Sequence, residues 1–86
     1  MYYLYILKSE RNSRYYVGST DDLVRRLQEH NAGKTPSTRN KGPWRIIHTE
    51  TFQTHSEARS REAKIKSWKS RAYMERVLGL SVSSGG

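Results

Sequence analysis

The first apolar run of the chain covers residues 2–7 and reads YYLYIL. This composition favours a strand. Because alternate residues of a strand point to opposite faces, Leu4 and Ile6 share one face. The other face carries Tyr3 and Tyr5. The pattern therefore predicts a short strand with large side chains on both faces.

A second strand is predicted for residues 14–18, after a polar segment short enough for a hairpin. We therefore expect two antiparallel strands. If the turn is centred near Glu10 and Arg11, Tyr5 lies opposite Tyr16 on the same face of the sheet. The two tyrosines would then be direct neighbours.

An amphipathic helix is predicted for residues 21–31, directly after this strand. Residues 19–21 read STD, which are good N-cap types, and Gly33 follows the helix. Arg26 and His30 are four positions apart and therefore lie one turn apart on one edge of the apolar stripe. The stripe itself consists of Leu23, Val24 and Leu27. A strand with a tyrosine thus leads into a helix that directs an arginine and a histidine toward one place.

The remaining elements are marked by glycine, proline and capping residues. We expect a loop over residues 34–43, a third strand over residues 44–52, and a second helix with Ser56 as its N-cap. Ser70 is predicted to cap a short last helix that ends at Gly79.

Together these elements predict the α+β class, with a three-stranded antiparallel sheet flanked by about three helices. The chain of 86 residues has room for one domain with a thin core, which we place at residues 1–80. The composition of residues 81–86, SVSSGG, predicts a disordered tail.

Glu62 is an acidic residue on the apolar stripe of the second predicted helix. The stripe is formed by Ala58, Ile65 and Trp68. A carboxylate on such a face is unfavourable unless a cation or an ion-pair partner accompanies it. Nearby arginines are candidate partners, and position alone favours a structural salt bridge over a functional role.

The net charge of the chain indicates a kind of binding partner. With 16 Lys and Arg against 8 Asp and Glu, the formal charge is +8. Such an excess in a small domain favours nucleic acid. Cysteine is absent, which excludes disulfides and cysteine-based metal or redox sites. The apolar runs are too short to span a bilayer, so we expect a cytoplasmic protein. The cations expected to contact nucleic acid belong to the basic loop and one face of the second helix: Lys34, Arg39, Lys41, Arg45, Lys64, Lys66 and Lys69.

The order of these features resembles the GIY-YIG nuclease family. Residues 3–5, YLY, match its first motif loosely, and residues 16–18, YVG, match its second motif closely. The likeness covers about residues 2–78 and is strongest to the small stand-alone members. It implies the fold given above and an endonuclease that hydrolyses phosphodiester bonds in nucleic acid, with DNA expected before RNA. It also implies a divalent metal cofactor, Mg²⁺ or Mn²⁺.

The resemblance also implies roles for individual residues. It makes Tyr5 and Tyr16 the active-site tyrosines. Arg26 becomes the residue that contacts the phosphate, His30 a supporting polar group, and Glu62 the metal ligand. One tyrosine would relay a proton from the attacking water, directly or through the histidine, and the sequence leaves open which one.

Three positions depart from the family pattern. Tyr3 stands where the first motif usually has glycine, and Ser19 stands where some relatives have lysine. An asparagine that some relatives carry after the glutamate has no clear match. The alternative function is therefore a nucleic-acid-binding module of the same fold with little or no cleavage. A third is a small protein whose basic face docks an acidic partner protein.

Overall fold

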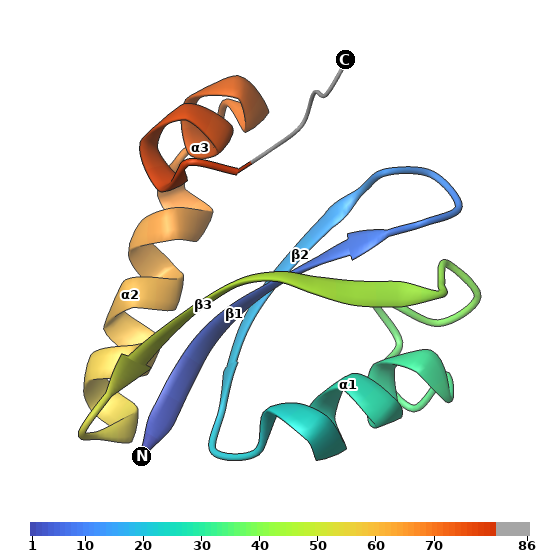
Figure 1. Cartoon of the computed structure of the whole chain (residues 1–86), viewed down its shortest axis with the longest axis horizontal. Helices are drawn as coiled ribbons and strands as arrows, with labels where there is room; N and C mark the ends of the chain where they lie inside the picture. The colour runs from blue at the N-terminus through green and yellow to red at the C-terminus, as the bar shows by residue number, and fades with distance from the viewer. Residues whose placement is uncertain (81–86) are drawn as a thin grey trace.

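A computed structural model describes residues 1–80, so the predicted tail lies outside the described residues. Within this part of the chain lie three strands and three helices (Figure 1). In chain order they are β1 (Tyr2–Ser9), β2 (Tyr15–Thr20), α1 (Leu23–Asn31), β3 (Trp44–Phe52), α2 (His55–Ser67) and α3 (Arg71–Leu78). The predicted α+β class is confirmed. None of these helices is long and apolar enough to cross a membrane.

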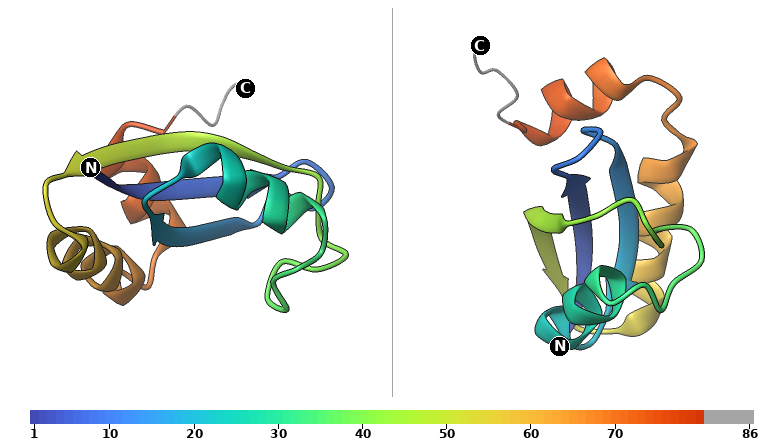
Figure 2. Two further views of the ribbon diagram at one scale, coloured as in Figure 1. Left: turned by 90° about the horizontal axis from the view of Figure 1, so that it is seen from below. Right: turned by 90° about the vertical axis from the view of Figure 1, so that its right-hand side faces the viewer.

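The sheet is antiparallel throughout and has the order β2-β1-β3, with β1 in the centre (Figures 1 and 2). The central position explains the unbroken apolar run of β1, because both faces of this strand are buried. Leu4 and Ile6 pack with Ile65 of α2 and Met74 of α3. On the opposite face, Leu7 packs with Trp44 of β3 and with Leu23 and Leu27 of α1. Val24, which the sequence placed on the same apolar stripe, is exposed instead. The two sides of the sheet are therefore covered by different helices.

The register of the β1–β2 hairpin differs by two residues from the prediction. Tyr5 pairs with Gly18, and Tyr16 pairs with Leu7. The turn is centred nearer Asn12 than expected, with the backbone N–H of Ser9 donating to the carbonyl of Arg14 at 2.8 Å. Because the side-chain period of a strand is two, this shift keeps both tyrosines on the same face. It places a glycine, not a tyrosine, opposite Tyr5.

The helix boundaries correct two predicted caps. Asp22 caps α1, and its side chain accepts a hydrogen bond from the backbone N–H of Arg25 at 3.0 Å. Thr54, rather than Ser56, caps α2 in a reciprocal capping box with Glu57. A residue that precedes the first helical turn can reach its free N–H groups, and Ser56 already lies inside that turn. The predicted ends of α3 are confirmed at Ser70 and at Gly79, which has φ 68°.

The loop between α1 and β3 is held against the sheet by side chains. Asn31 accepts a hydrogen bond from the backbone N–H of Trp44 at 2.7 Å and donates to its carbonyl at 3.1 Å. The indole N–H of Trp44 in turn donates to the carbonyl of Thr38 at 3.1 Å. Trp44 is 5% exposed and belongs to the core. These bonds draw the middle of the loop inward.

Candidate active site

Tyr5, Tyr16 and His30 meet on the face of the sheet that α1 covers. The ring centroids of Tyr5 and Tyr16 are 6.4 Å apart, and that of His30 lies 4.8 Å from Tyr16. The Tyr5 hydroxyl is 2.9 Å from Nε2 of His30, and both side chains are almost completely buried. The hairpin thus brings Tyr5 and Tyr16 together, and the helix that follows it adds His30.

Gly18 makes room for this arrangement. A Cβ atom at this position would lie 2.5 Å from the Tyr5 hydroxyl oxygen and 2.6 Å from the ring carbon that carries it. Any other residue would therefore push the phenol away. The glycine of the Tyr-Val-Gly motif is required by the close approach of a side chain from the neighbouring strand.

Burial shifts the pKa values of both partners. Desolvation raises the pKa of Tyr5 to about 12, and hydrogen bonding to the Arg26 guanidinium opposes this shift. Burial, and then the positive charge of Arg26, lower the pKa of His30 to about 4. Both groups are therefore neutral near pH 7. A tyrosine in this state needs an acceptor for its proton before it can act as a base.

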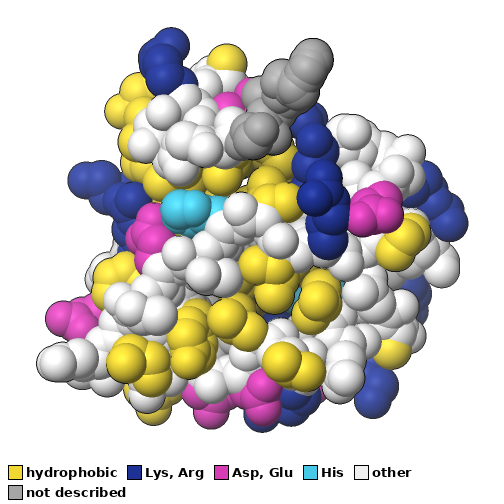
Figure 3. All heavy atoms as spheres, viewed as in Figure 1, with side chains coloured by type: hydrophobic (Ala, Val, Ile, Leu, Met, Phe, Trp, Pro, Cys, Tyr) yellow, Lys and Arg dark blue, Asp and Glu magenta, His cyan; other side chains and the backbone are white. Residues whose placement is uncertain are grey.

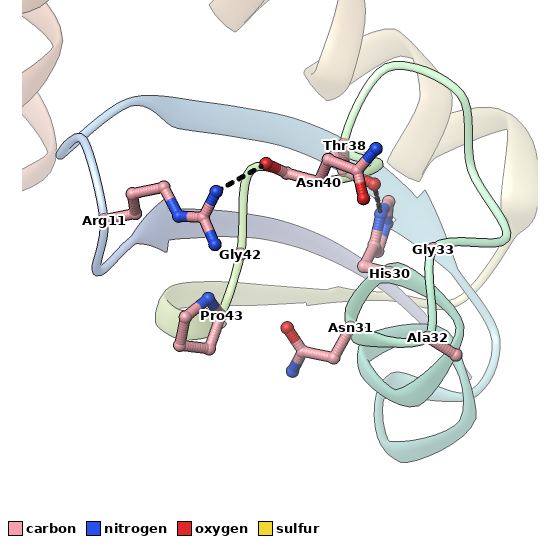
Figure 4. Close-up of a pocket in the computed structure, with 9 residues that line it drawn as sticks. All are labelled: Arg11, His30, Asn31, Ala32, Gly33, Thr38, Asn40, Gly42 and Pro43. Atoms are coloured by element: carbon pink, nitrogen blue, oxygen red, sulfur yellow. Dashed lines mark hydrogen bonds between the residues drawn. The ribbon is translucent and has the colours of Figure 1, made fainter.

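Thr38, which the sequence did not single out, completes a buried chain of hydrogen bonds. Its hydroxyl oxygen lies 2.8 Å from Nδ1 of His30, and the residue is 1% exposed (Figure 4). We call Tyr5, His30 and Thr38 the histidine chain. No periodicity signals this residue, because it lies in a loop whose neighbours are exposed. Its place in the site becomes visible only in the folded structure, where its carbonyl accepts a hydrogen bond from the indole of Trp44.

Arg26 lies at the edge of the site, where its guanidinium donates to Glu29 at 2.9 Å. This hydrogen bond raises the pKa of Arg26, which stays charged. The side chain is about one third exposed, so part of its donor fork remains accessible. Arg26 also borders a hollow of about 460 Å³, together with Ser19. An anion could therefore reach this arginine from solvent.

Glu62 reaches the site from α2, on the other side of β2. Its carboxylate accepts a hydrogen bond from the hydroxyl of Ser19 at 2.8 Å and one from the ammonium of Lys66 at 2.6 Å. The ion-pair partner is thus a lysine one turn further along the helix, not one of the arginines that the sequence suggested. We call Ser19, Glu62 and Lys66 the carboxylate chain. Its glutamate is close enough to raise the pKa of Tyr5.

The donor set fits a loosely held metal ion rather than a closed cage. Within residues 1–80, there is no group of three or more His, Asp or Glu side chains that could hold a metal. The Glu62 side chain is 21% exposed, and two hydrogen bonds leave lone pairs on its two oxygens. Mg²⁺ commonly binds through one or two carboxylates and keeps waters and substrate phosphates as its other ligands. A hydrated Mg²⁺ or Mn²⁺ is compatible with this single carboxylate.

The predicted nucleic-acid contacts do not form the helix face that the sequence suggested. Helix α2 ends at Ser67, so Lys69 lies beyond it, and Lys64 and Lys66 are about 200° apart around the helix axis. Basic side chains form several separate groups on the face seen in Figure 3. The loop cations Lys34, Arg39 and Lys41 are exposed, as is Arg45, which pairs with Glu10 at 3.4 Å.

Comparisons with known proteins agree with this fold and site. The chain matches the model of the GIY-YIG catalytic domain over residues 1–75. A UPF0213 protein of Listeria monocytogenes serotype 4b is 46% identical to it over 66 residues, which cover 76% of this chain and 73% of that protein. A UPF0213 protein of Natronomonas pharaonis is 41% identical over 78 residues, covering 90% and 89% of the two chains.

A solved structure is similar as well. The solution NMR structure of a UPF0213 protein from Bacillus halodurans has 34% identity and a TM-score of 0.58, and the match covers 92% of this chain and 84% of that one. The predicted resemblance to small stand-alone proteins is confirmed. The chain therefore belongs to the GIY-YIG family, a family of the nuclease type.

Proposed function

We propose that this protein is a metal-dependent endonuclease that hydrolyses phosphodiester bonds in nucleic acid, with DNA as the expected substrate. The observation that carries the proposal is the meeting of groups from four elements around the Tyr5 hydroxyl. The ring of Tyr5 in β1 lies 6.4 Å from that of Tyr16 in β2, and the Lys66 ammonium that pairs with Glu62 of α2 lies 5.9 Å from the centre of the Tyr16 ring. The guanidinium of Arg26 in α1 and the Glu62 carboxylate both influence the pKa of Tyr5. A cationic fork, a carboxylate and a group that can move a proton are what phosphodiester hydrolysis needs at one place.

In this proposal the arginine binds the substrate, and the tyrosines serve the proton transfer. The accessible part of the Arg26 fork binds a phosphate oxygen and offsets charge that develops on it. Tyr5 lies beside His30, which offers a nitrogen as a proton acceptor. Tyr16 supports the pair through its ring, which packs on the imidazole. The nearly complete burial of Tyr5 and His30 excludes bulk water from the proton-transfer step.

Glu62 is the residue that would hold the metal. Bound there, Mg²⁺ or Mn²⁺ would polarise the phosphate and stabilise the leaving oxygen. The Ser19 hydroxyl orients the carboxylate through its hydrogen bond at 2.8 Å. With one protein ligand, the metal affinity is expected to be weak until a phosphate supplies further ligands.

The Glu62–Lys66 ion pair favours a second candidate function, a nucleic-acid-binding module that does not cut. Lys66 already neutralises the carboxylate at 2.6 Å. A phosphate could then approach this side of the site without a metal ion, because repulsion from the carboxylate is reduced. In such a module the surface cations alone would hold the nucleic acid.

The experiment that separates these functions uses Glu62→Gln, which keeps the shape and removes the charge. The variant should remain folded, because Lys66 is half exposed and water can solvate it once its partner is gone. Cleavage with Mg²⁺ or Mn²⁺ should fall at least about 100-fold, since a lost metal ligand removes several kcal/mol of transition-state stabilisation. Nucleic-acid binding should persist or become tighter.

Glu10→Gln is the matched control, because it also removes one carboxylate from a surface ion pair. Glu10 lies in the hairpin turn, away from Tyr5 and Tyr16. Cleavage of single-stranded, duplex and branched DNA and RNA should be measured with each metal and with EDTA, alongside the thermal midpoint. A Glu62→Gln variant that cuts in proportion to its folded fraction contradicts the metal-ligand role. Wild-type protein that binds but never cuts supports the binding module.

A further inference from the structure

The direction of each hydrogen bond in the histidine chain can be worked out from its far end. The Thr38 hydroxyl oxygen lies 3.3 Å from the carbonyl oxygen of Thr35. A carbonyl oxygen can only accept, so this contact is a hydrogen bond only when the hydroxyl proton points to Thr35. The same hydroxyl oxygen is 2.8 Å from Nδ1 of His30, and with its proton on the Thr35 side it accepts there. In this arrangement the proton of the imidazole is on Nδ1.

This assignment determines what the imidazole presents to Tyr5. A neutral histidine carries one N–H, and burial keeps His30 neutral. Nε2 is then a bare lone pair at 2.9 Å from the Tyr5 hydroxyl, which must donate its proton to it. The lone pairs of the Tyr5 oxygen remain available to accept from the Arg26 guanidinium. Each donor in the histidine chain thus has an acceptor.

The other tautomer would leave the site wrongly arranged. With its proton on Nε2, the imidazole would donate to Tyr5, and the tyrosine would have no acceptor for its own proton on that side. Its hydroxyl proton would turn toward the Arg26 guanidinium, which is itself a donor. The two tautomers therefore differ in whether Tyr5 can release its proton to a neighbour.

Thr38 is held in place by bonds that do not depend on the histidine. Its backbone N–H donates to Thr35 at 3.1 Å, and its carbonyl accepts from the indole of Trp44. In Figure 4, Thr38 points toward His30 from the loop, beside a hollow of about 380 Å³ that both residues line. The loop that carries the exposed cations Lys34 and Arg39 thus also supplies the buried group that touches the imidazole.

We propose that Thr38 is a positioning residue that fixes His30 as the Nδ1–H tautomer, so that Nε2 faces the Tyr5 hydroxyl as a proton acceptor. Its importance for catalysis rests on the proposed nuclease function, whereas its effect on the tautomer does not. In the proposed step the attacking water gives a proton to the Tyr5 oxygen while the O–H proton of Tyr5 passes to Nε2. One O–H bond of the water and the O–H bond of Tyr5 break, and a new O–H bond on Tyr5 and an N–H bond at Nε2 form. The products are a hydroxide that attacks the phosphorus and an imidazolium, and Tyr5 stays neutral throughout.

The test compares Thr38→Val, which keeps the shape but removes the hydroxyl, with Thr38→Ser, which keeps the hydroxyl. Nitrogen-15 NMR of the full-length protein near pH 7 reports which ring nitrogen of His30 is protonated, and a His30→Gln sample assigns the signal. Wild-type protein and Thr38→Ser should show the Nδ1–H form. Thr38→Val should show a mixture or the Nε2–H form. In the cleavage assay, kcat of Thr38→Val should fall about tenfold or more with KM unchanged, and serine should restore it.

Two outcomes would overturn the proposal: a wild-type His30 protonated on Nε2, or a Thr38→Val variant that keeps the pure Nδ1–H form. The first requires no variant, so the proposal remains testable if valine prevents folding. The NMR measurement also needs no nuclease activity. A protein that never cuts but shows the expected change in tautomer would contradict the proposed function and still support the role of Thr38 in the histidine chain.

Discussion

The histidine chain and the carboxylate chain lie on two sides of the candidate site and differ in burial and charge. Each member of the histidine chain is at most 2% exposed, and its groups are neutral near pH 7. In the carboxylate chain, the side chains of Glu62 and Lys66 are 21% and 50% exposed and carry opposite charges. Both are joined by short hydrogen bonds, but only one is shielded from water.

In the proposed function, this difference would divide the tasks of the site between the two chains. Buried hydrogen bonds are costly to break without a replacement, so the histidine chain holds one arrangement before any substrate arrives. Groups at the surface exchange partners with water and ions at little cost, so the carboxylate chain can release Lys66 and accept another cation. The rigid side is suited to moving a proton, and the exchangeable side to binding a metal.

Acid should affect the histidine chain most strongly. The pKa of His30 is about 4 in the folded protein, against an ordinary value of 6.5. Between these two pH values, the imidazole of His30 is therefore protonated in the unfolded chain and neutral in the folded protein. Stability is fully present above pH 6.5 and is lost as the pH falls toward 4, by about 3 kcal/mol in the free energy of unfolding.

The measurement is chemical denaturation of wild-type protein and His30→Gln across this pH range. Other carboxylates titrate here in both proteins, so the difference between the two curves isolates the histidine. Wild-type stability should rise with pH relative to the variant. Parallel curves would mean that His30 is not held neutral, and the contrast between the two chains would be lost.

Gly18→Ala is expected to have the next largest effect on stability, because the added methyl group on β2 would collide with Tyr5 of the histidine chain. The added Cβ would lie 2.5 Å from the Tyr5 hydroxyl oxygen, so the buried phenol must move. Overpacking of this kind typically costs about 1–3 kcal/mol, and we also expect the Tyr5–His30 hydrogen bond to break.

Gly79→Ala is the control for Gly18→Ala. It introduces strain through its positive φ of 68°, but its Cβ would meet nothing within 4 Å in the described structure. It should cost about 1 kcal/mol and leave the tyrosines undisturbed. Denaturation and the NMR signals of His30 measure both variants. An unchanged His30 signal in Gly18→Ala would show that the close approach does not constrain Tyr5.

The smallest effect on stability is expected for Lys66→Met, which breaks the ion pair of the carboxylate chain. The pair joins residues four apart on a helix and is half open to solvent, so its loss should change the free energy of unfolding by less than about 1 kcal/mol. If Glu62 is the metal ligand, removing its competing cation should raise the affinity of the free protein for Mn²⁺ several-fold. Metal titration without nucleic acid measures this, and an unchanged affinity would argue against the assignment.

The elements of this protein could be predicted because their signals are local. Alternating side chains of a strand, a helical stripe and the caps at Ser70 and Gly79 depend on neighbours within a few residues. Errors fell where several residues could serve equally well. Three good N-cap types preceded Asp22, and the cap of α2 lay two residues before the one predicted. The hairpin turn was misplaced for the same reason, and only the period of the strands kept Tyr5 and Tyr16 on one face.

By itself, the sequence determined the order of the elements, the face on which Tyr5 and Tyr16 lie, and the presence of an acidic residue among the apolar positions of α2. Only the tertiary structure decided what these residues touch. Thr38 joins the site because its carbonyl accepts from the Trp44 indole, and Ser19 reaches Glu62 because α2 packs beside β2. Such contacts join segments whose separation in the chain carries no periodic signal, and they form only when packing brings the segments together.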